Sequence, residues 1–210
     1  MENIKKTWFE IDGKLEPIDF KGPSYFRYPL DLALKVIEEF CIPRGSVFDP
    51  FAGFGTTLVA AQQTGRSGIG FELDLERATF AQSRIRSPGR VIHDRIQNLA
   101  KYNLPKFDLI FTSPPYASFE SQENDPKEKY TIAFETIFCS FKSLMHDKSN
   151  LVIEISNVKD NRGALPIAFL ATAALMKHYR FHGEIVRCNT GSEAAGPGYD
   201  HSYLLVFTLT

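Results

Sequence analysis

Apolar and polar residues alternate along this chain in short blocks, which predict strands and helices in turn. Runs with the length and apolar content of buried strands occupy residues 46–49, 68–72, 90–93, 107–112 and 150–156. Segments with helical spacing separate these runs and cover residues 30–40, 57–64, 74–86, 131–145 and 164–178. Strands that alternate with helices indicate βαβ units, and therefore an α/β fold built on a mainly parallel sheet with helices on both faces.

The two ends of the chain depart from this alternation. Near the N-terminus, Asp12-Gly13 lies between two short apolar runs and predicts a β-hairpin within an extension of residues 1–22. At the C-terminus, strands 184–190 and 202–209 are joined by a Gly-rich loop without a helix, so we expect an antiparallel pair at one edge of the sheet. In the middle of the chain, the polar stretch 117–130 suits either a mobile loop at the active site or a solvated linker.

Composition is that of an ordinary globular protein. The chain has 210 residues, of which 43% are hydrophobic and 23% charged, and no shift in composition divides it, so residues 1–210 are expected to form a single domain. The net charge of −1 means that any affinity for nucleic acid must come from a local surface. Its three cysteines form no closely spaced pair, which argues against a metal cluster or a disulfide scaffold and favours a cytoplasmic location. No apolar stretch is long enough to span a membrane.

A glycine-containing segment follows the first of the buried strands. From Asp49 to Thr57 it reads Asp-Pro-Phe-Ala-Gly-Phe-Gly-Thr-Thr and leads into a predicted helix, the position at which doubly wound sheets bind ligands. Gly53 and Gly55 allow positive φ angles and a close approach of the backbone to a ligand. The segment has neither the lysine of a phosphate-binding loop nor the third glycine of the GxGxxG pattern. Taken alone, it also suits a tight turn between strand and helix.

Acidic residues end the next two predicted strands. Glu72 follows the glycine loop by about 20 residues, where a carboxylate accepts hydrogen bonds from a ribose. Asp94 is placed to accept a hydrogen bond from an adenine amino group, although it also suits the cap of a short helix at 95–100. The loop and the two carboxylates together predict a pocket for an adenosine group without a phosphate cradle.

The most distinctive motif is Thr112-Ser113-Pro114-Pro115-Tyr116, at the end of the fourth predicted strand. Its two prolines stiffen the backbone and remove two N–H donors, which leaves nearby carbonyl groups free to accept hydrogen bonds. Tyr116 offers a flat face for stacking, and the Ser113 hydroxyl both donates and accepts. The motif therefore suits a planar base with an exocyclic amino group, and the alternative interpretation is a rigid turn.

Together, the glycine loop and the Ser-Pro-Pro-Tyr motif resemble those of the S-adenosylmethionine-dependent DNA amino-methyltransferases. The resemblance covers residues 24–209, and the Ser-Pro-Pro-Tyr form is most similar to the cytosine-N4 enzymes. It implies a Rossmann-like class I methyltransferase fold, with a seven-stranded, mainly parallel sheet, one antiparallel edge strand and helices on both faces. In many enzymes with this motif the glycine loop follows it, whereas here the glycine loop comes first.

The resemblance also implies the roles of individual residues. S-Adenosyl-L-methionine would be the cofactor, and the residues that would bind it are Phe26, Asp49, Phe51, Gly53, Gly55, Thr56, Glu72 and Asp94. Those that would hold the target base and serve catalysis are Ser113, Pro114, Pro115 and Tyr116. The implied reaction is direct methyl transfer to N4 of cytosine in DNA, without a metal. Cytosine-C5 methylation is excluded, because it needs a nucleophilic thiolate in a Pro-Cys pair and no cysteine here follows a proline.

Several alternatives stay open at this point. Adenine-N6 methylation of DNA would use the same mechanism, and methylation of an amino group in tRNA or rRNA is favoured by the little room left for a target-recognition region. A methyltransferase for a protein or small molecule, and a cofactor-binding subunit that supports a catalytic partner, are further candidates. The expected partner is nucleic acid, with DNA preferred over RNA, and no membrane. The chain would act as a homodimer or with a separate specificity partner, as in restriction–modification systems.

Overall fold

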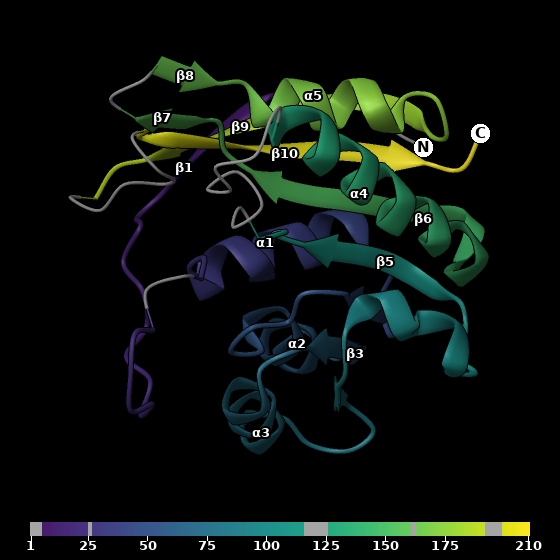
Figure 1. Ribbon diagram of the computed structural model, residues 1–210. Coiled ribbons are helices and arrows are strands. Elements are labelled where there is room, and N and C mark those ends of the chain that lie inside the picture. The colour runs from purple at the N-terminus through teal and green to yellow at the C-terminus, as the bar shows by residue number, and fades with distance from the viewer. Residues whose placement is uncertain (1–5, 25–26, 116–125, 161–162, 192–198) are drawn as a thin grey trace.

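The computed structural model describes residues 6–24, 27–115, 126–160, 163–191 and 199–210 (Figure 1). The α-helices are α1 (Leu30–Phe40), α2 (Thr56–Gln63), α3 (Leu75–Arg84), α4 (Pro126–Ser140) and α5 (Ile167–Leu175), and two 3-10 helices cover Ile96–Lys101 and Phe141–Leu144. The strands are β1 (Trp8–Ile11), β2 (Ser46–Asp49), β3 (Ser67–Glu72), β4 (Arg90–His93), β5 (Phe107–Thr112), β6 (Met145–Ile155), β7 (Val158–Asp160), β8 (Gly163–Leu165), β9 (Arg180–Asn189) and β10 (His201–Thr208).

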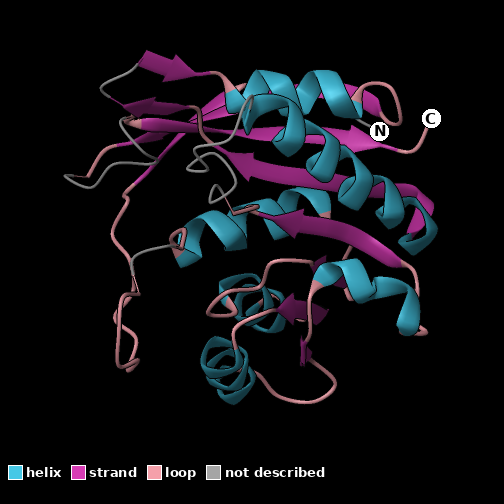
Figure 2. Ribbon diagram, viewed as in Figure 1, coloured by secondary structure: helices cyan, strands magenta, loops and turns pink. Residues whose placement is uncertain are grey.

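One eight-stranded sheet forms the centre of the fold, in the order β1-β9-β10-β6-β5-β2-β3-β4, and β7 and β8 pair separately. The strands from β6 to β4 in this order are parallel neighbours, whereas β10 runs antiparallel to both β6 and β9 (Figure 2). The predicted α/β, Rossmann-like class is confirmed. The predicted strand count and the edge position of the antiparallel strand are wrong, because β9 and β1 both add to the sheet outside β10.

The N-terminal hairpin predicted within residues 1–22 is also wrong. Trp8–Ile11 pairs in parallel with Val186 to Asn189, and residues 12–20 contain no strand. The Asp12-Gly13 signal is local, but the open edge of β9 offers β1 backbone partners from a distant part of the chain. Of the predicted loop 117–130, residues 117–125 lie outside the described part of the chain, and the remainder begins α4.

Helices cover both faces of the sheet, as the alternation predicts. On one face, α1 buries Leu32, Ala33, Val36 and Ile37 in a cluster with residues of α2, β5 and β10. On the other face, α4 and α5 pack with the 3-10 segments over a cluster rich in phenylalanine (Figure 1). None of the described helices is both long and apolar enough to cross a membrane.

Parallel pairing brings the ends of several strands to one edge of the sheet. Strands β2, β3, β4, β5 and β6 run in the same direction, so their carboxyl ends share this edge. The residues at or just after these ends include Asp49, Glu72, Asp94 and Ser113. This carboxyl edge therefore collects the predicted site residues that come from distant parts of the sequence.

Candidate active site

The glycine loop between β2 and α2 is held in place by the end of the neighbouring strand. The N–H of Gly53 donates a hydrogen bond of 2.8 Å to Oε2 of Glu72. Gly53 and Gly55 adopt left-handed backbone conformations, with φ of 53° and 80°. A Cβ on Gly55 would lie 3.0 Å from Cβ of Ala81, whereas one on Gly53 would meet no atom within 4 Å. Gly55 thus combines a left-handed backbone with little room for a side chain, and Gly53 leaves open space beside the loop.

Asp49 is the centre of a buried polar cluster that joins the glycine loop to the end of β5. Its carboxylate accepts hydrogen bonds from the Thr57 hydroxyl, from the Thr112 hydroxyl at 2.7 Å and from the N–H of Phe51 at 3.1 Å. The hydroxyl groups of Thr57 and Tyr28 are hydrogen-bonded in turn. Burial raises the pKa of Asp49 to about 6, against the lowering effect of these hydrogen bonds.

Thr56, the first residue of α2, carries a buried polar atom without a partner. Its side chain belongs to a residue that is only 4% exposed, and its Oγ1 makes no hydrogen bond in the structure. A buried hydroxyl normally finds a partner, because leaving it unpaired costs about 1–3 kcal/mol. Thr56 lies directly after Gly55, so this atom is at the same loop as the open space beside Gly53.

The two carboxylates predicted for the adenosine group differ in their surroundings. Oε2 of Glu72 accepts the hydrogen bond from the N–H of Gly53, and Oε1 accepts one of 2.9 Å from the N–H of Asp74. Glu72 therefore holds the glycine loop in addition to ending β3. Asp94 is engaged by the Asn98 side chain, the Tyr102 hydroxyl and the backbone of the next residue. Hydrogen bonds from Asn98 and Tyr102 lower the pKa of Asp94. Its role toward adenine stays a prediction, and the local contacts show that it also orders the turn after β4.

The described part of the Ser-Pro-Pro-Tyr motif leaves the sheet at the end of β5. Ser113 is half-buried, Pro114 is buried and Pro115 is exposed, while Tyr116 lies outside the described residues, as does Phe26. Phe51 packs against Phe138 of α4, with ring centroids 6.5 Å apart. The structure thus brings Ser113 and the glycine loop to one edge through the Asp49–Thr112 contact.

A buried ion pair behind Ser113 was missed by sequence reasoning. The Ser113 hydroxyl donates a hydrogen bond of 2.8 Å to Oε2 of Glu154 on β6, and Oε1 of Glu154 lies 3.4 Å from Nη1 of Arg187 on β9. Glu154 is 5% exposed and Arg187 is 3% exposed. The only signal in the sequence is one glutamate within the apolar run 150–156, which is unusual for a strand buried on both faces.

The segment before α1 is tied to the glycine loop by a second set of contacts. Arg84 donates a hydrogen bond of 2.7 Å to the carbonyl of Phe54, and its other terminal nitrogen lies 3.3 Å from Oε1 of Glu16. Glu16 also pairs with Arg27, at 3.1 Å. Phe20 packs edge-to-face on Phe54, with ring centroids 4.9 Å apart. Glu16, Phe20 and Arg27 are therefore anchored beside the loop by charge and by aromatic packing.

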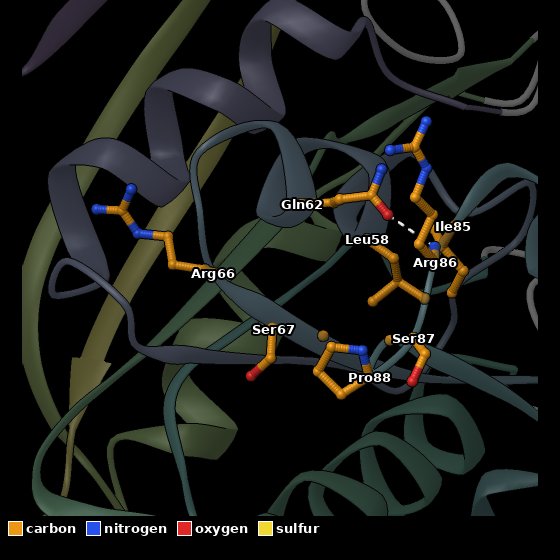
Figure 3. Close-up of a pocket in the computed structure, with 10 residues that line it drawn as sticks. Leu58, Gln62, Arg66, Ser67, Ile85, Arg86, Ser87 and Pro88 are labelled. Atoms are coloured by element: carbon orange, nitrogen blue, oxygen red, sulfur yellow. Dashed lines mark hydrogen bonds between the residues drawn. The ribbon is translucent and has the colours of Figure 1, made fainter.

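A pocket of about 320 Å³ lies at the other end of β3, away from this site (Figure 3). Ser67, the first residue of β3, lines it together with Leu58, Gln62 and residues 85–89. The Gln62 side chain accepts a hydrogen bond of 2.7 Å from the N–H of Arg86. None of the predicted site residues lines this pocket. The candidate site is thus the open carboxyl edge rather than this hollow.

Comparisons with known proteins find similarity over part of the chain. A family model described as DNA methylase matches residues 5–83, which include the glycine loop and Glu72. The type II methyltransferase M.MthZI of Methanothermobacter thermautotrophicus is 36% identical over 81 residues, which cover 38% of this chain and 23% of that protein. The predicted resemblance to the DNA amino-methyltransferases is confirmed.

Two further similarities are to an RNA methyltransferase in sequence and to a methyltransferase in fold. A tRNA (guanine(10)-N(2))-methyltransferase of Xenopus laevis is 28% identical over 160 residues, which cover 65% of this chain and 32% of that protein. The crystal structure of a TehB-like SAM-dependent methyltransferase from Corynebacterium glutamicum matches with a TM-score of 0.59 at 14% identity, over 85% of this chain and 87% of the other. The chain therefore spans only about a quarter to a third of the length of these two sequence relatives.

The glycine loop fits the cofactor of the methyltransferase fold. S-Adenosyl-L-methionine as cofactor agrees with the fold and with the matched family. The open space beside Gly53 permits a close approach of a ligand to the backbone. Glu72 has spare lone pairs, because a carboxylate offers about four acceptor sites and two are used. Among the described residues, the surroundings of Gly53 and Glu72 permit cofactor binding, and the binding roles of these two residues and of Thr56 stay predictions.

Proposed function

We propose that this protein transfers a methyl group from S-adenosyl-L-methionine to an exocyclic amino group of a nucleobase, preferentially N4 of cytosine in DNA. The observation that carries the proposal is the 2.7 Å hydrogen bond from Thr112 to Asp49. It ties the end of β5, where Ser113-Pro114-Pro115 begins, to the strand that leads into the glycine loop. A donor-binding loop and an amine-binding motif thereby share one edge of the sheet.

The division of work follows from the residue types. The cofactor would supply an electrophilic methyl group on a sulfonium centre and leave as a neutral thioether, and the protein supplies position. The amino nitrogen loses one proton to water after the transfer. Ser113 accepts a hydrogen bond from the amino group, and the prolines keep the neighbouring carbonyl groups free to accept another. Holding both amino hydrogens directs the nitrogen lone pair out of the plane of the base, toward a methyl donor. Because a base within a duplex cannot reach such a site, it must be flipped out or single-stranded.

The direct test is incubation of the protein with labelled S-adenosyl-L-methionine and mixed nucleic acids, followed by mass spectrometry of the nucleosides. N4-methylcytosine in DNA is the expected product. N6-methyladenine would correct the base and keep the mechanism. Binding of the cofactor without transfer to any nucleic acid would overturn the proposal in favour of a cofactor-binding subunit.

Two variants separate the donor half from the acceptor half of the site. Glu72→Gln should weaken cofactor binding about tenfold or more, because it removes an acceptor that also holds the Gly53 N–H. Ser113→Ala should bind the cofactor normally and lose about tenfold or more in methyl transfer. Calorimetric titration with the cofactor and initial rates on nucleic acid measure the two effects. Normal rates with Ser113→Ala would contradict the role of Ser113.

Methylation of an amino group in RNA is the second candidate. It is favoured by the similarity to a tRNA methyltransferase, which extends over 65% of this chain and so covers more of it than the match to M.MthZI does. The same incubation with duplex DNA and with total RNA in separate reactions distinguishes the two substrates. A homodimer or a separate specificity subunit, which would compensate for the short chain, is tested by sedimentation of the protein alone and with DNA.

A further inference from the structure

The single hydroxyl proton of Ser113 is used in a hydrogen bond to Glu154. The hydroxyl donates to Oε2 of Glu154 at 2.8 Å. A carboxylate in an ion pair accepts hydrogen bonds and donates none, so the proton must lie on the serine side of this contact. The two lone pairs of Ser113 Oγ are then the groups left for any molecule at the carboxyl edge of the sheet.

The charge of Glu154 is secured by Arg187 through the architecture of the sheet. Strand β10 lies between β6 and β9, with Leu204 opposite Glu154 and Ser202 opposite Arg187. The ion pair therefore spans β10, with the two charged side chains on the same face. Arginine stays protonated at all relevant pH values. Removing one partner of a pair buried to this extent would leave an uncompensated charge, so the two residues act as a unit.

We infer that Glu154 and Arg187 set the hydrogen-bonding polarity of Ser113, and that this polarity selects an amino group over a carbonyl group on the target base. The inference rests on the proposed function and adds a specificity determinant to it. Cytosine and uracil differ in the exocyclic group, NH₂ against C=O, and in the proton on the neighbouring ring nitrogen, as do adenine and hypoxanthine. A Ser113 oxygen that can only accept forms a hydrogen bond with the amino group of cytosine or adenine. It repels the carbonyl oxygen of uracil or hypoxanthine, because both oxygens then present lone pairs.

Glu154→Gln should reverse this polarity with almost no change in shape. Arg187 still needs an acceptor, so the Gln carbonyl turns toward it and the Gln amide NH₂ donates to Ser113 Oγ. The serine proton is then released toward the substrate. We expect methyl transfer to the amino base to fall about tenfold to a hundredfold, the usual effect of one hydrogen bond to or from a charged group. Competition by the deaminated base should become stronger than in the unmodified protein.

The assay uses short random-sequence single strands that carry the base methylated in the product analysis, with the same strands after deamination as competitor. The effect of Glu154→Gln is measured in the unmodified protein and in Ser113→Ala. A polarity effect disappears in the Ser113→Ala background, whereas a merely structural effect persists there. Ser202→Ala is the matched control, because Ser202 is buried opposite Arg187 and its hydroxyl has no hydrogen-bond partner. It should leave base selectivity unchanged.

The outcomes separate this inference from the function on which it rests. If the unmodified protein methylates no nucleobase, the proposed function and this inference both fail. If it methylates a nucleobase and Glu154→Gln keeps the rate and the selectivity, only this inference fails. If Glu154→Gln does not fold, Glu154→Asp is used instead. It keeps the negative charge beside Arg187, and its shorter side chain moves the carboxylate away from the Ser113 hydroxyl by the length of one methylene group. Its selectivity should then fall without reversing, and unchanged selectivity would overturn the inference.

Discussion

Asp49 offers a direct test of the buried cluster that joins the glycine loop to β5. Burial raises its pKa to about 6, although hydrogen bonds from Thr57, Thr112 and the Phe51 N–H oppose the shift. In an unfolded chain, the pKa of an aspartate is about 3.9. Each unit of difference corresponds to about 1.4 kcal/mol, so the full effect on the free energy of unfolding is roughly 3 kcal/mol.

The sign of the effect follows from which state holds the proton. Between the two pKa values, folded Asp49 is protonated while the unfolded chain has released the proton. The free energy of unfolding therefore falls as the pH rises from about 4 to about 6 and then levels off, as far as this group is concerned. Asp49→Asn lacks this contribution, so its stability relative to the unmodified protein should rise by roughly 2–3 kcal/mol between pH 4 and pH 7.

Urea denaturation of the unmodified protein and of Asp49→Asn, followed by circular dichroism at a series of pH values, measures this difference. Thr112→Val is a second arm, because it removes a hydrogen bond that lowers the pKa and should move the pH window upward. A carbon NMR titration of the Asp49 carboxyl group gives the pKa directly. If the two denaturation profiles run parallel throughout, the reasoning from burial is refuted.

Two further substitutions test how the glycine loop is held. Gly55→Ala should lower the free energy of unfolding by at least roughly 1–2 kcal/mol, because φ is 80° and the new Cβ would lie 3.0 Å from that of Ala81. Urea denaturation checks it, and an unchanged midpoint would contradict the described loop. Arg84→Ala should release both the carbonyl of Phe54 and the carboxylate of Glu16. Limited proteolysis should then cut the segment before α1 faster, and an unchanged cutting rate would show that this contact is dispensable.

The sequence predicts the parallel part of the fold well, because its strands and helices follow from hydrophobic patterns within short segments. Short apolar strands and helical spacing identify β2 to β6 and the helices between them. The position of β1 could not be predicted, since Asp12-Gly13 is a strong local turn signal and the partner of β1 lies near residue 186. The pairing of β1 with β9 also moves the antiparallel pair of β9 and β10 away from the edge of the sheet, and a strand prediction does not show which strands join outside such a pair.

The candidate site was predictable where its residues stand in motifs and not where they act through long-range pairs. Gly53 and Ser113 belong to recognisable segments, whereas Glu154 is one acidic residue in an apolar strand. Its partners Ser113 and Arg187 are 41 and 33 residues away. Only the register across β10 shows that these side chains meet.

The order of the strands also has an evolutionary consequence. The residues proposed to hold the methyl donor include Asp49 on β2, Glu72 on β3 and residues that follow β2 and β4. Ser113 follows β5, and its partners Glu154 and Arg187 stand on β6 and β9, on the other side of the boundary between β2 and β5. Substitutions on β6 and β9 therefore lie away from the residues proposed to hold the donor. Enzymes with this topology can therefore change the substrate that they methylate during evolution while they keep the same methyl donor.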